Sequence, residues 1–160
     1  MKAAAIQMVS GASLDANLRA AHALLREAAQ QGAELAVLPE YFCLMGHQDT
    51  DKLAVREPPG SGTVQAFLAS TARELGLWLV GGTLPMVASD ADHVRNTNLV
   101  FSPAGDCVAR YDKIHLFRFD NGRERYDESR VIEAGRTPVA FELPSRDGHR
   151  WKIGMSVCYD

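Results

Sequence analysis

The sequence predicts an α/β domain, and three observations support that fold class. The chain has 160 residues, of which 46% are hydrophobic and 23% charged, as in ordinary globular domains with one core. Two short apolar runs, Leu35–Leu38 and Leu77–Val80, have the length and composition of buried strands. A segment whose apolar residues repeat at helical spacing precedes each run. This alternation of strands and helices is typical of α/β domains.

Cap and turn residues mark the elements of the first half. A strand is expected over Lys2–Met8, followed by a helix that Ser13 can cap and that ends at Gly32. A second helix is expected after the Pro/Gly-rich segment 58–62, with its end at Gly76. The apolar residues at helical spacing are Leu14, Leu18, Ala21, Leu25 and Ala28 in the first helix and Val64, Phe67, Leu68 and Leu75 in the second.

The second half is expected to contain two hairpins separated by a long irregular segment. Strands over Asn96–Phe101 and Cys107–Tyr111 form the first hairpin. Strands over Val139–Leu143 and Trp151–Val157 form the second, and the last of them is interpreted as a buried strand. Residues 112–136 lie between the hairpins, and an irregular segment of this length is more often functional than a simple connection.

Charge, hydropathy and cysteine content exclude several classes of partner. There are 17 basic and 20 acidic residues, a net charge of −3, and no basic stripe that would bind nucleic acid. No run of about 18 apolar residues is present, so no membrane span is expected, and the first residues do not form a signal peptide. Three cysteines are an odd and sparse set that suits a reducing compartment. A cytoplasmic location is therefore predicted.

Three chemically distinct side chains, Glu40, Lys113 and Cys158, are each expected just beyond the end of a strand. A carboxylate can act as a general base, an ammonium group can stabilise an oxyanion, and a thiol can act as a nucleophile. Each residue alone has a simpler explanation, as a loop acid, a surface lysine and a buried cysteine. Together they favour an active site, because a nucleophilic thiol needs both a base and an oxyanion donor.

Three sequence blocks around these residues resemble a known family. The blocks are Leu38-Pro39-Glu40-Tyr41-Phe42, Tyr111-Asp112-Lys113-Ile114-His115-Leu116-Phe117 and Ser156-Val157-Cys158-Tyr159-Asp160. In type, order and spacing they are similar to the signature blocks of the nitrilase (carbon–nitrogen hydrolase) superfamily. The forms Lys-Ile-His-Leu-Phe and Cys-Tyr-Asp most resemble its Nit-like amidase branch, which includes omega-amidase and deaminated glutathione amidase.

The resemblance implies a fold and a role for each matching residue. Cys158 would be the nucleophile, Glu40 the general base and Lys113 the oxyanion stabiliser. Glu128 would orient the lysine, and the backbone N–H of Tyr159 would be a second oxyanion donor. The implied fold is a four-layer α-β-β-α sandwich that forms a homo-oligomer, a dimer or larger. No metal or organic cofactor is implied.

The implied reaction is hydrolysis of a small linear carboxamide to a carboxylic acid and ammonia through a cysteine thioester. Nitrile or N-carbamoyl hydrolysis within the same superfamily remains an alternative, because Asp112 and Arg118 depart from the residues that many relatives carry beside the lysine. Relatives also continue well beyond the cysteine. Residues 1–160 are therefore expected to be the N-terminal part of a carbon–nitrogen hydrolase domain, with the sandwich incomplete at the C-terminus. A catalytically inactive fragment is a further alternative.

Two other sites have weaker support in the sequence. Cys43 and His47 are four residues apart, but Cys107 and His115 are too loosely spaced to complete a typical zinc site. The Gly60-Ser61-Gly62 segment precedes a helix without completing a known phosphate-binding pattern, and helix capping explains Ser61 equally well.

Overall fold

The computed structural model describes residues 1–160, which form a central mixed sheet of six strands. The strand order is β1-β2-β3-β5-β4, and β6 pairs with the opposite edge of β5. These strands are β1 (Ala3–Ala5), β2 (Leu35–Val37), β3 (Trp78–Val80), β4 (Leu84–Val87), β5 (Val94–Phe101) and β6 (Cys107–Asp112). Because β5 is antiparallel to both β3 and β6, strands β2 and β6 run in the same direction and end at the same edge of the sheet. The α/β class is confirmed.

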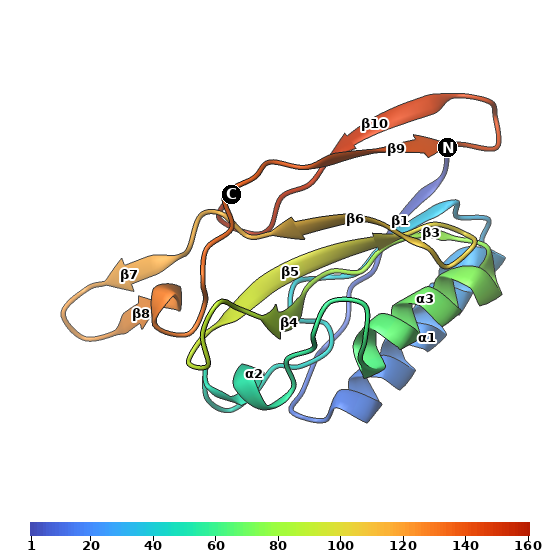
Figure 1. Ribbon diagram of the computed structural model, residues 1–160. Helices are drawn as coiled ribbons and strands as arrows, with labels where there is room; N and C mark the ends of the chain where they lie inside the picture. The colour runs from blue at the N-terminus through green and yellow to red at the C-terminus, as the bar shows by residue number, and fades with distance from the viewer.

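Two long helices cover one face of this sheet (Figure 1). Helix α1 (Leu14–Gln30) begins as predicted, with the Ser13 hydroxyl accepting from the Ala16 N–H, and α3 (Thr63–Leu75) ends at Gly76 in the left-handed conformation. Between these helices and the sheet lies an apolar cluster of 19 buried residues. A short helix, α2 (Asp51–Ala54), was not predicted.

The start of α3 differs from the sequence prediction. Ser61 does not cap the helix; instead, the Glu57 carboxylate accepts from the N–H groups of Val64 (2.6 Å) and Gln65 (3.1 Å). A Cβ on Gly62, which has φ +142°, would lie 2.1 Å from the Glu57 carboxyl carbon. A carboxylate of the chain itself therefore occupies the helix end where a phosphate would bind.

A hairpin of β9 (Ala140–Pro144) and β10 (Arg150–Gly154) lies over the other face of the sheet (Figure 1). Leu35, Val80, Val100, Phe141 and Leu143 form a second buried cluster there. The prediction of a buried strand over Trp151–Val157 is wrong: β10 ends at Gly154, pairs only with β9, and leaves Trp151 42% exposed. Having one neighbouring strand, β10 buries little of its surface.

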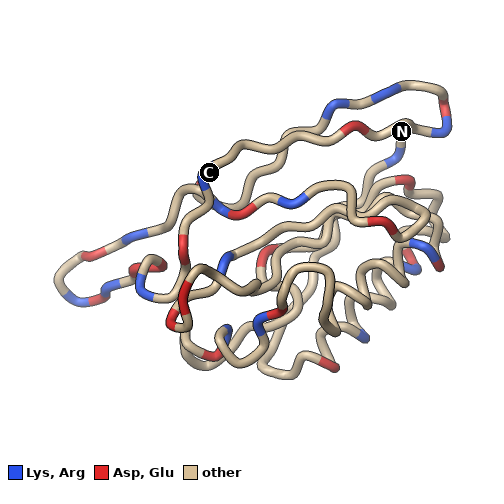
Figure 2. Tube along the Cα trace, viewed as in Figure 1, with Lys and Arg blue, Asp and Glu red and all other residues tan.

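Residues 112–136 contain more regular structure than the sequence predicts. Strands β7 (Arg118–Asp120) and β8 (Arg125–Asp127) form a hairpin that projects from the sheet, and a 3-10 helix, Glu128–Arg130, follows it. Figure 2 shows alternating charges along this projection. No helix of the chain is both long and apolar enough to cross a membrane.

Candidate active site

A buried lysine joins two carboxylates at the edge where β2 and β6 end. Lys113 follows β6 directly, and its side chain is fully buried. Its Nζ lies 3.3 Å from Glu40 Oε1 and 2.9 Å from Glu128 Oε2. Glu40 lies just beyond β2, and Glu128 begins the 3-10 helix. Segments far apart in the sequence therefore bring three of the predicted site residues together.

The charges around Lys113 keep it protonated. Burial alone lowers the pKa of the ammonium group, but the hydrogen bond to Glu128 and the charges of Glu40 and Glu128 outweigh burial, and the pKa is raised. Glu128 is itself fixed, because its Oε2 accepts a hydrogen bond of 2.8 Å from the Phe117 N–H. The lysine is thus a charged donor with a defined direction at neutral pH.

Two residues that the sequence analysis did not single out hold Glu40 in place. The Asn96 amide, on β5, donates to Glu40 Oε1 (2.7 Å) and to the Tyr41 hydroxyl (3.1 Å), and Asn96 is 1% exposed. The Tyr41 N–H donates to Thr83 Oγ1 (2.8 Å). Asn96 begins a predicted strand, and this position is the only signal that the sequence offers for its role.

A glycine allows the Glu40 turn to approach the end of β3. Gly82 has φ +58°, and a Cβ there would lie 2.1 Å from the Pro39 carbonyl oxygen. Any side chain would therefore displace the backbone on which Glu40 depends. Tyr41 also has a positive φ, of 53°, which a non-glycine residue adopts only when its surroundings hold it there.

The sequence predicts Cys158 directly at the end of a strand. In the structure it lies instead in a turn, four residues beyond the end of β10. Its φ is +51°, and the residue is exposed. It lines a cavity of about 130 Å³ together with Glu40, Gly82, Thr83 and Asn98. The structure therefore places the predicted nucleophile and the predicted base on the same small cavity.

The Cys158 thiol is protonated at neutral pH. Partial desolvation of the sulfur and the negative charge of Glu40 raise its pKa, and the positive charge of Lys113 opposes them without cancelling them. A thiol in this state becomes a nucleophile only when a base removes its proton. Glu40 supplies a carboxylate to the same cavity that Cys158 lines, so it is the candidate for this base.

Tyr159 follows with its ring edge-on to Phe117, at 5.6 Å between ring centroids. Its side chain is largely exposed, so the ring does not bury the turn. The hydrogen bonds of this turn run instead through Val157 and Asp160. Asp160 is a further residue that the sequence analysis did not single out.

The two residues that depart from the family pattern have partners of their own. Asp112 accepts hydrogen bonds from Thr97 (2.6 Å) and Arg110 (3.1 Å). Arg118 pairs with Asp127 across the β7–β8 hairpin, at 3.1 Å. Neither side chain forms a hydrogen bond or an ion pair with Glu40, Lys113 or Cys158.

The sequence profile of the carbon-nitrogen hydrolase family matches residues 2–160. The chain belongs to the carbon-nitrogen hydrolase family. It is 37% identical over 145 residues to omega-amidase NIT2 of Danio rerio, covering 90% of this chain and 49% of that protein. It is 34% identical over 161 residues to deaminated glutathione amidase of Synechocystis sp., covering 99% of this chain and 57% of that protein. The chain thus spans about half the length of the curated relatives it matches.

A solved structure shows the same fold. The NitFhit protein of C. elegans superposes on this carbon-nitrogen hydrolase chain with a TM-score of 0.76 and 27% sequence identity. The match covers 97% of this chain and 37% of that protein. The prediction of a nitrilase-type α/β fold is confirmed.

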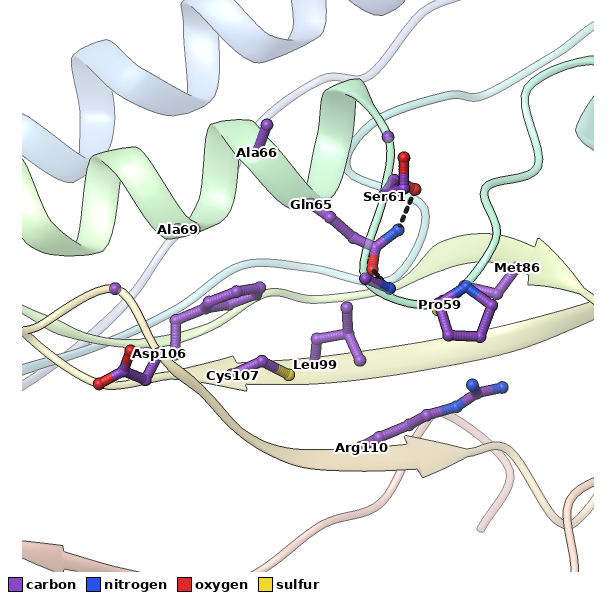
Figure 3. Close-up of a pocket in the computed structure, with 14 residues that line it drawn as sticks. Pro59, Ser61, Gln65, Ala66, Ala69, Met86, Leu99, Asp106, Cys107 and Arg110 are labelled. Carbon is purple, nitrogen blue, oxygen red and sulfur yellow. Dashed lines mark hydrogen bonds between the residues drawn. The ribbon is translucent and has the colours of Figure 1, made fainter.

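The other candidate sites of the hydrolase chain do not assemble. Cys43 is buried with its sulfur 3.7 Å from the Thr83 carbonyl oxygen, whereas Cys107 is exposed on β6. No three His, Cys, Asp or Glu side chains cluster in a way that would hold a metal ion. A cavity of about 720 Å³ lies between α3 and strands β5 and β6 (Figure 3). It includes Gly60–Gly62 but none of the predicted catalytic residues.

Proposed function

We propose that this site hydrolyses a small linear carboxamide to a carboxylic acid and ammonia through a thioester on Cys158. The observation that carries the proposal is the charged, fully buried Lys113, held by Glu40 and Glu128 beside a cavity that Glu40 shares with Cys158. Family membership and the names of the amidase relatives support the same reaction class.

In the first step, Glu40 removes the Cys158 proton as the sulfur attacks the carbonyl carbon of the amide. The carbonyl π electrons move to oxygen, and a tetrahedral oxyanion forms. The Lys113 ammonium group and the Tyr159 backbone N–H stabilise that oxyanion. Glu128 keeps the ammonium group in place, since it binds Lys113 and the Phe117 N–H at the same time.

In the second step, the oxyanion collapses and the carbon–nitrogen bond breaks. Glu40 returns its proton to the nitrogen, and ammonia leaves. Glu40 then takes a proton from water as the water oxygen attacks the thioester, and the acid is released with the sulfur as leaving group. The cysteine regains its proton from Glu40, so the balance is amide plus water giving acid plus ammonia.

The proposal extends to the setting of the site. Residues 1–160 form part of a carbon–nitrogen hydrolase domain that acts as a homo-oligomer in the cytoplasm, on a small amide and without a bound cofactor. Light scattering of the purified protein tests the oligomer, since a monomer over the working concentration range contradicts it. Subcellular fractionation tests the location.

The reaction is tested with the protein expressed from the complete reading frame. Ammonia release is measured from the monoamide of a short linear dicarboxylic acid, from the corresponding nitrile and from an N-carbamoyl amino acid. We expect the amide to be hydrolysed fastest, with loss of activity in Cys158→Ala and full activity in Cys107→Ala, which alters an exposed cysteine on β6. Preference for the nitrile or the carbamoyl compound would overturn the substrate class, and an active Cys158→Ala variant would overturn the mechanism.

A further inference from the structure

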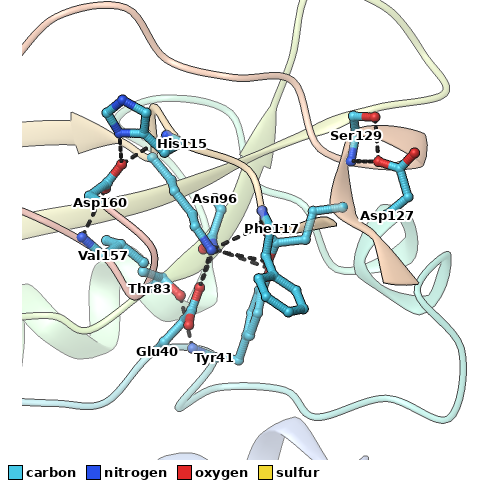
Figure 4. Close-up of polar contacts among 12 residues, drawn as sticks. Glu40, Tyr41, Thr83, Asn96, His115, Phe117, Asp127, Ser129, Val157 and Asp160 are labelled. Atoms are coloured by element: carbon cyan, nitrogen blue, oxygen red, sulfur yellow. Dashed lines mark hydrogen bonds and ion pairs between the residues drawn. The ribbon is translucent and has the colours of Figure 1, made fainter. Parts of the chain in front are cut away.

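The Asp160 carboxylate accepts hydrogen bonds from two separate segments of the candidate site, one that contains His115 and one that contains Val157 (Figure 4). The side chain of Asp160 is 7% exposed. Its Oδ2 accepts from the Tyr111 hydroxyl (2.6 Å) and the Val157 N–H (3.0 Å). Its Oδ1 accepts from the N–H (2.8 Å) and the ring Nδ1 (2.9 Å) of His115. Two donors therefore reach each oxygen, and the carboxylate has no free acceptor for a substrate.

The donors come from the two segments that carry the candidate catalytic groups. Tyr111 and His115 stand two residues before and two residues after Lys113, whereas Val157 directly precedes Cys158. The Asp160 N–H also donates to the Val157 carbonyl oxygen (3.2 Å), which closes the turn around Cys158. The Asp160 side chain thus links the nucleophile turn to the lysine segment by hydrogen bonds.

The Cys158 turn needs such a link. With φ at +51°, Cys158 adopts a left-handed conformation that a non-glycine residue keeps only under external restraint. The strand before it ends at Gly154, and the turn residues themselves are mostly exposed. The Asp160 carboxylate supplies hydrogen bonds that tie this turn to a buried part of the sheet, because Tyr111 is 2% exposed.

The protonation states suit this role. Burial alone would raise the pKa of Asp160, but hydrogen bonds from Tyr111, His115 and Val157 outweigh it, and the pKa is lowered. Burial, with the hydrogen bond to Asp160, raises the pKa of Tyr111 to about 12, so its hydroxyl remains a donor. At neutral pH an ionised acceptor faces four donors, and hydrogen bonds to ions are the stronger ones.

We propose that Asp160 is a positioning residue. Through hydrogen bonds with Val157, Tyr111 and His115, it fixes the position of the Cys158 sulfur relative to the Lys113 ammonium group. This inference rests on the proposed function. Asp160 has no contact with the reacting atoms, so it acts on the placement of the nucleophile and not on substrate binding. A misplacement of about 1 Å in an active site costs about 100-fold in rate.

The test compares four variants of the protein expressed from the complete reading frame. Asp160→Asn keeps the shape but replaces one acceptor oxygen by an NH₂ group, which cannot accept from a backbone N–H. Tyr111→Phe removes a single hydroxyl, and the third variant combines both changes. Asp147→Asn is the control, because Asp147 also braces a turn, between β9 and β10, through Ser145 and the His149 N–H.

For Asp160→Asn we expect kcat for the amide to fall about 10- to 100-fold, with KM within about threefold and a parallel fall in the alkylation rate of Cys158 by iodoacetamide. Tyr111→Phe should lower kcat about threefold, and the double variant should match Asp160→Asn, because the hydroxyl acts through that carboxylate. Asp147→Asn should keep the wild-type kcat. Melting temperatures are measured in parallel.

Two results would overturn the inference. One is a wild-type kcat in Asp160→Asn, or in Tyr111→Phe where Asp160→Asn does not fold. The other is a loss in the double variant equal to the product of the single losses. Failure of the proposed function has a different signature, an inactive wild-type protein or an active Cys158→Ala variant, so the two failures are distinguishable.

Discussion

The face of the central sheet beneath α1 and α3 buries 19 residues in one apolar cluster, whereas the face beneath the β9–β10 hairpin buries five. Side chains alternate along β5, so Leu99 and Phe101 belong to the first cluster and Val100 to the second. Asn96 and Asn98 lie on the same side as Val100, at the end of the sheet where Glu40 and Lys113 meet.

The two faces of the sheet therefore have different roles. Apolar burial on the helix face stabilises the sheet, and the rigid sheet positions polar groups on the other face. Those polar groups are individually costly to bury and depend on one another for hydrogen bonds and charge neutralisation. Substitutions on the helix face should consequently change stability, and substitutions on the hairpin face should change chemistry.

The largest expected effect belongs to Cys158, the proposed nucleophile. Cys158→Ala should lower amide hydrolysis by at least about 10⁴-fold, because no other thiol lines the site cavity. The melting temperature should stay within about 2 °C, since Cys158 is exposed and packs little. Steady-state ammonia release and calorimetry measure the two quantities. A melting temperature that drops together with activity would show that Cys158 also contributes to the stability of the fold.

Glu40, the proposed general base, should have the next largest effect. Glu40→Gln keeps the hydrogen bond from Asn96 but removes the proton acceptor, and kcat should fall about 10²- to 10⁴-fold. Glu142→Gln, an exposed acid on β9, is the matched control and should retain the wild-type kcat. Equal activities of the two variants would exclude Glu40 as the base.

Catalytic activity should separate the faces, because buried substitutions on either face lower stability. Leu25→Ala, in the fully buried part of α1, should cost about 2–5 kcal/mol of unfolding free energy. Its kcat at 15 °C should be that of the wild type. Lys113→Met should cost about 3–5 kcal/mol, because it leaves Glu40 and Glu128 without their cation, and it should also reduce kcat. Denaturant titration and steady-state kinetics on the same samples test this separation, and a catalytic defect in folded Leu25→Ala would break it.

These same differences explain how far the sequence could predict the molecule. Helices α1 and α3 follow from the 3.6-residue spacing of residues such as Leu18 and Leu25, and their ends follow from Ser13 and Gly76. The grouping of Glu40 with Lys113 was predicted from their positions after strands and from the family blocks, and the structure places Lys113 Nζ 3.3 Å from Glu40 Oε1. The catalytic roles remain predictions.

The remaining features depend on partners distant in sequence. Asn96 donates a hydrogen bond to Glu40, 56 residues away in the sequence, and Asp160 accepts one from Tyr111, 49 residues away. No local sequence pattern indicates either contact. Glu57 replaces Ser61 at the start of α3 because the chain folds back on the helix end. Strands β7 and β8 are too short and exposed to show an apolar alternation.

The smallest expected effect is a pH dependence of stability. The folded pKa of Asp160 lies below the ordinary value of about 3.9 for an aspartate. Its stabilising contribution is therefore present above about pH 3.9 and is lost as the pH falls through the folded pKa. The stability difference between wild type and Asp160→Asn should thus shrink on acidification from pH 7 to pH 3. Asp106→Asn, at an exposed position in the β5–β6 turn, serves as control in denaturant titrations. A difference that stays constant with pH would contradict this assignment.

The most direct test of the central claim is intact-mass spectrometry of the protein quenched in acid during turnover of the dicarboxylic monoamide. The proposed mechanism predicts a covalent adduct with the mass of the acyl group, located on Cys158 by peptide mapping. The adduct should persist in Cys107→Ala and be absent from Cys158→Ala. Continued hydrolysis by Cys158→Ala, or an acyl adduct on another residue during turnover, would contradict the assignment of Cys158 as the nucleophile.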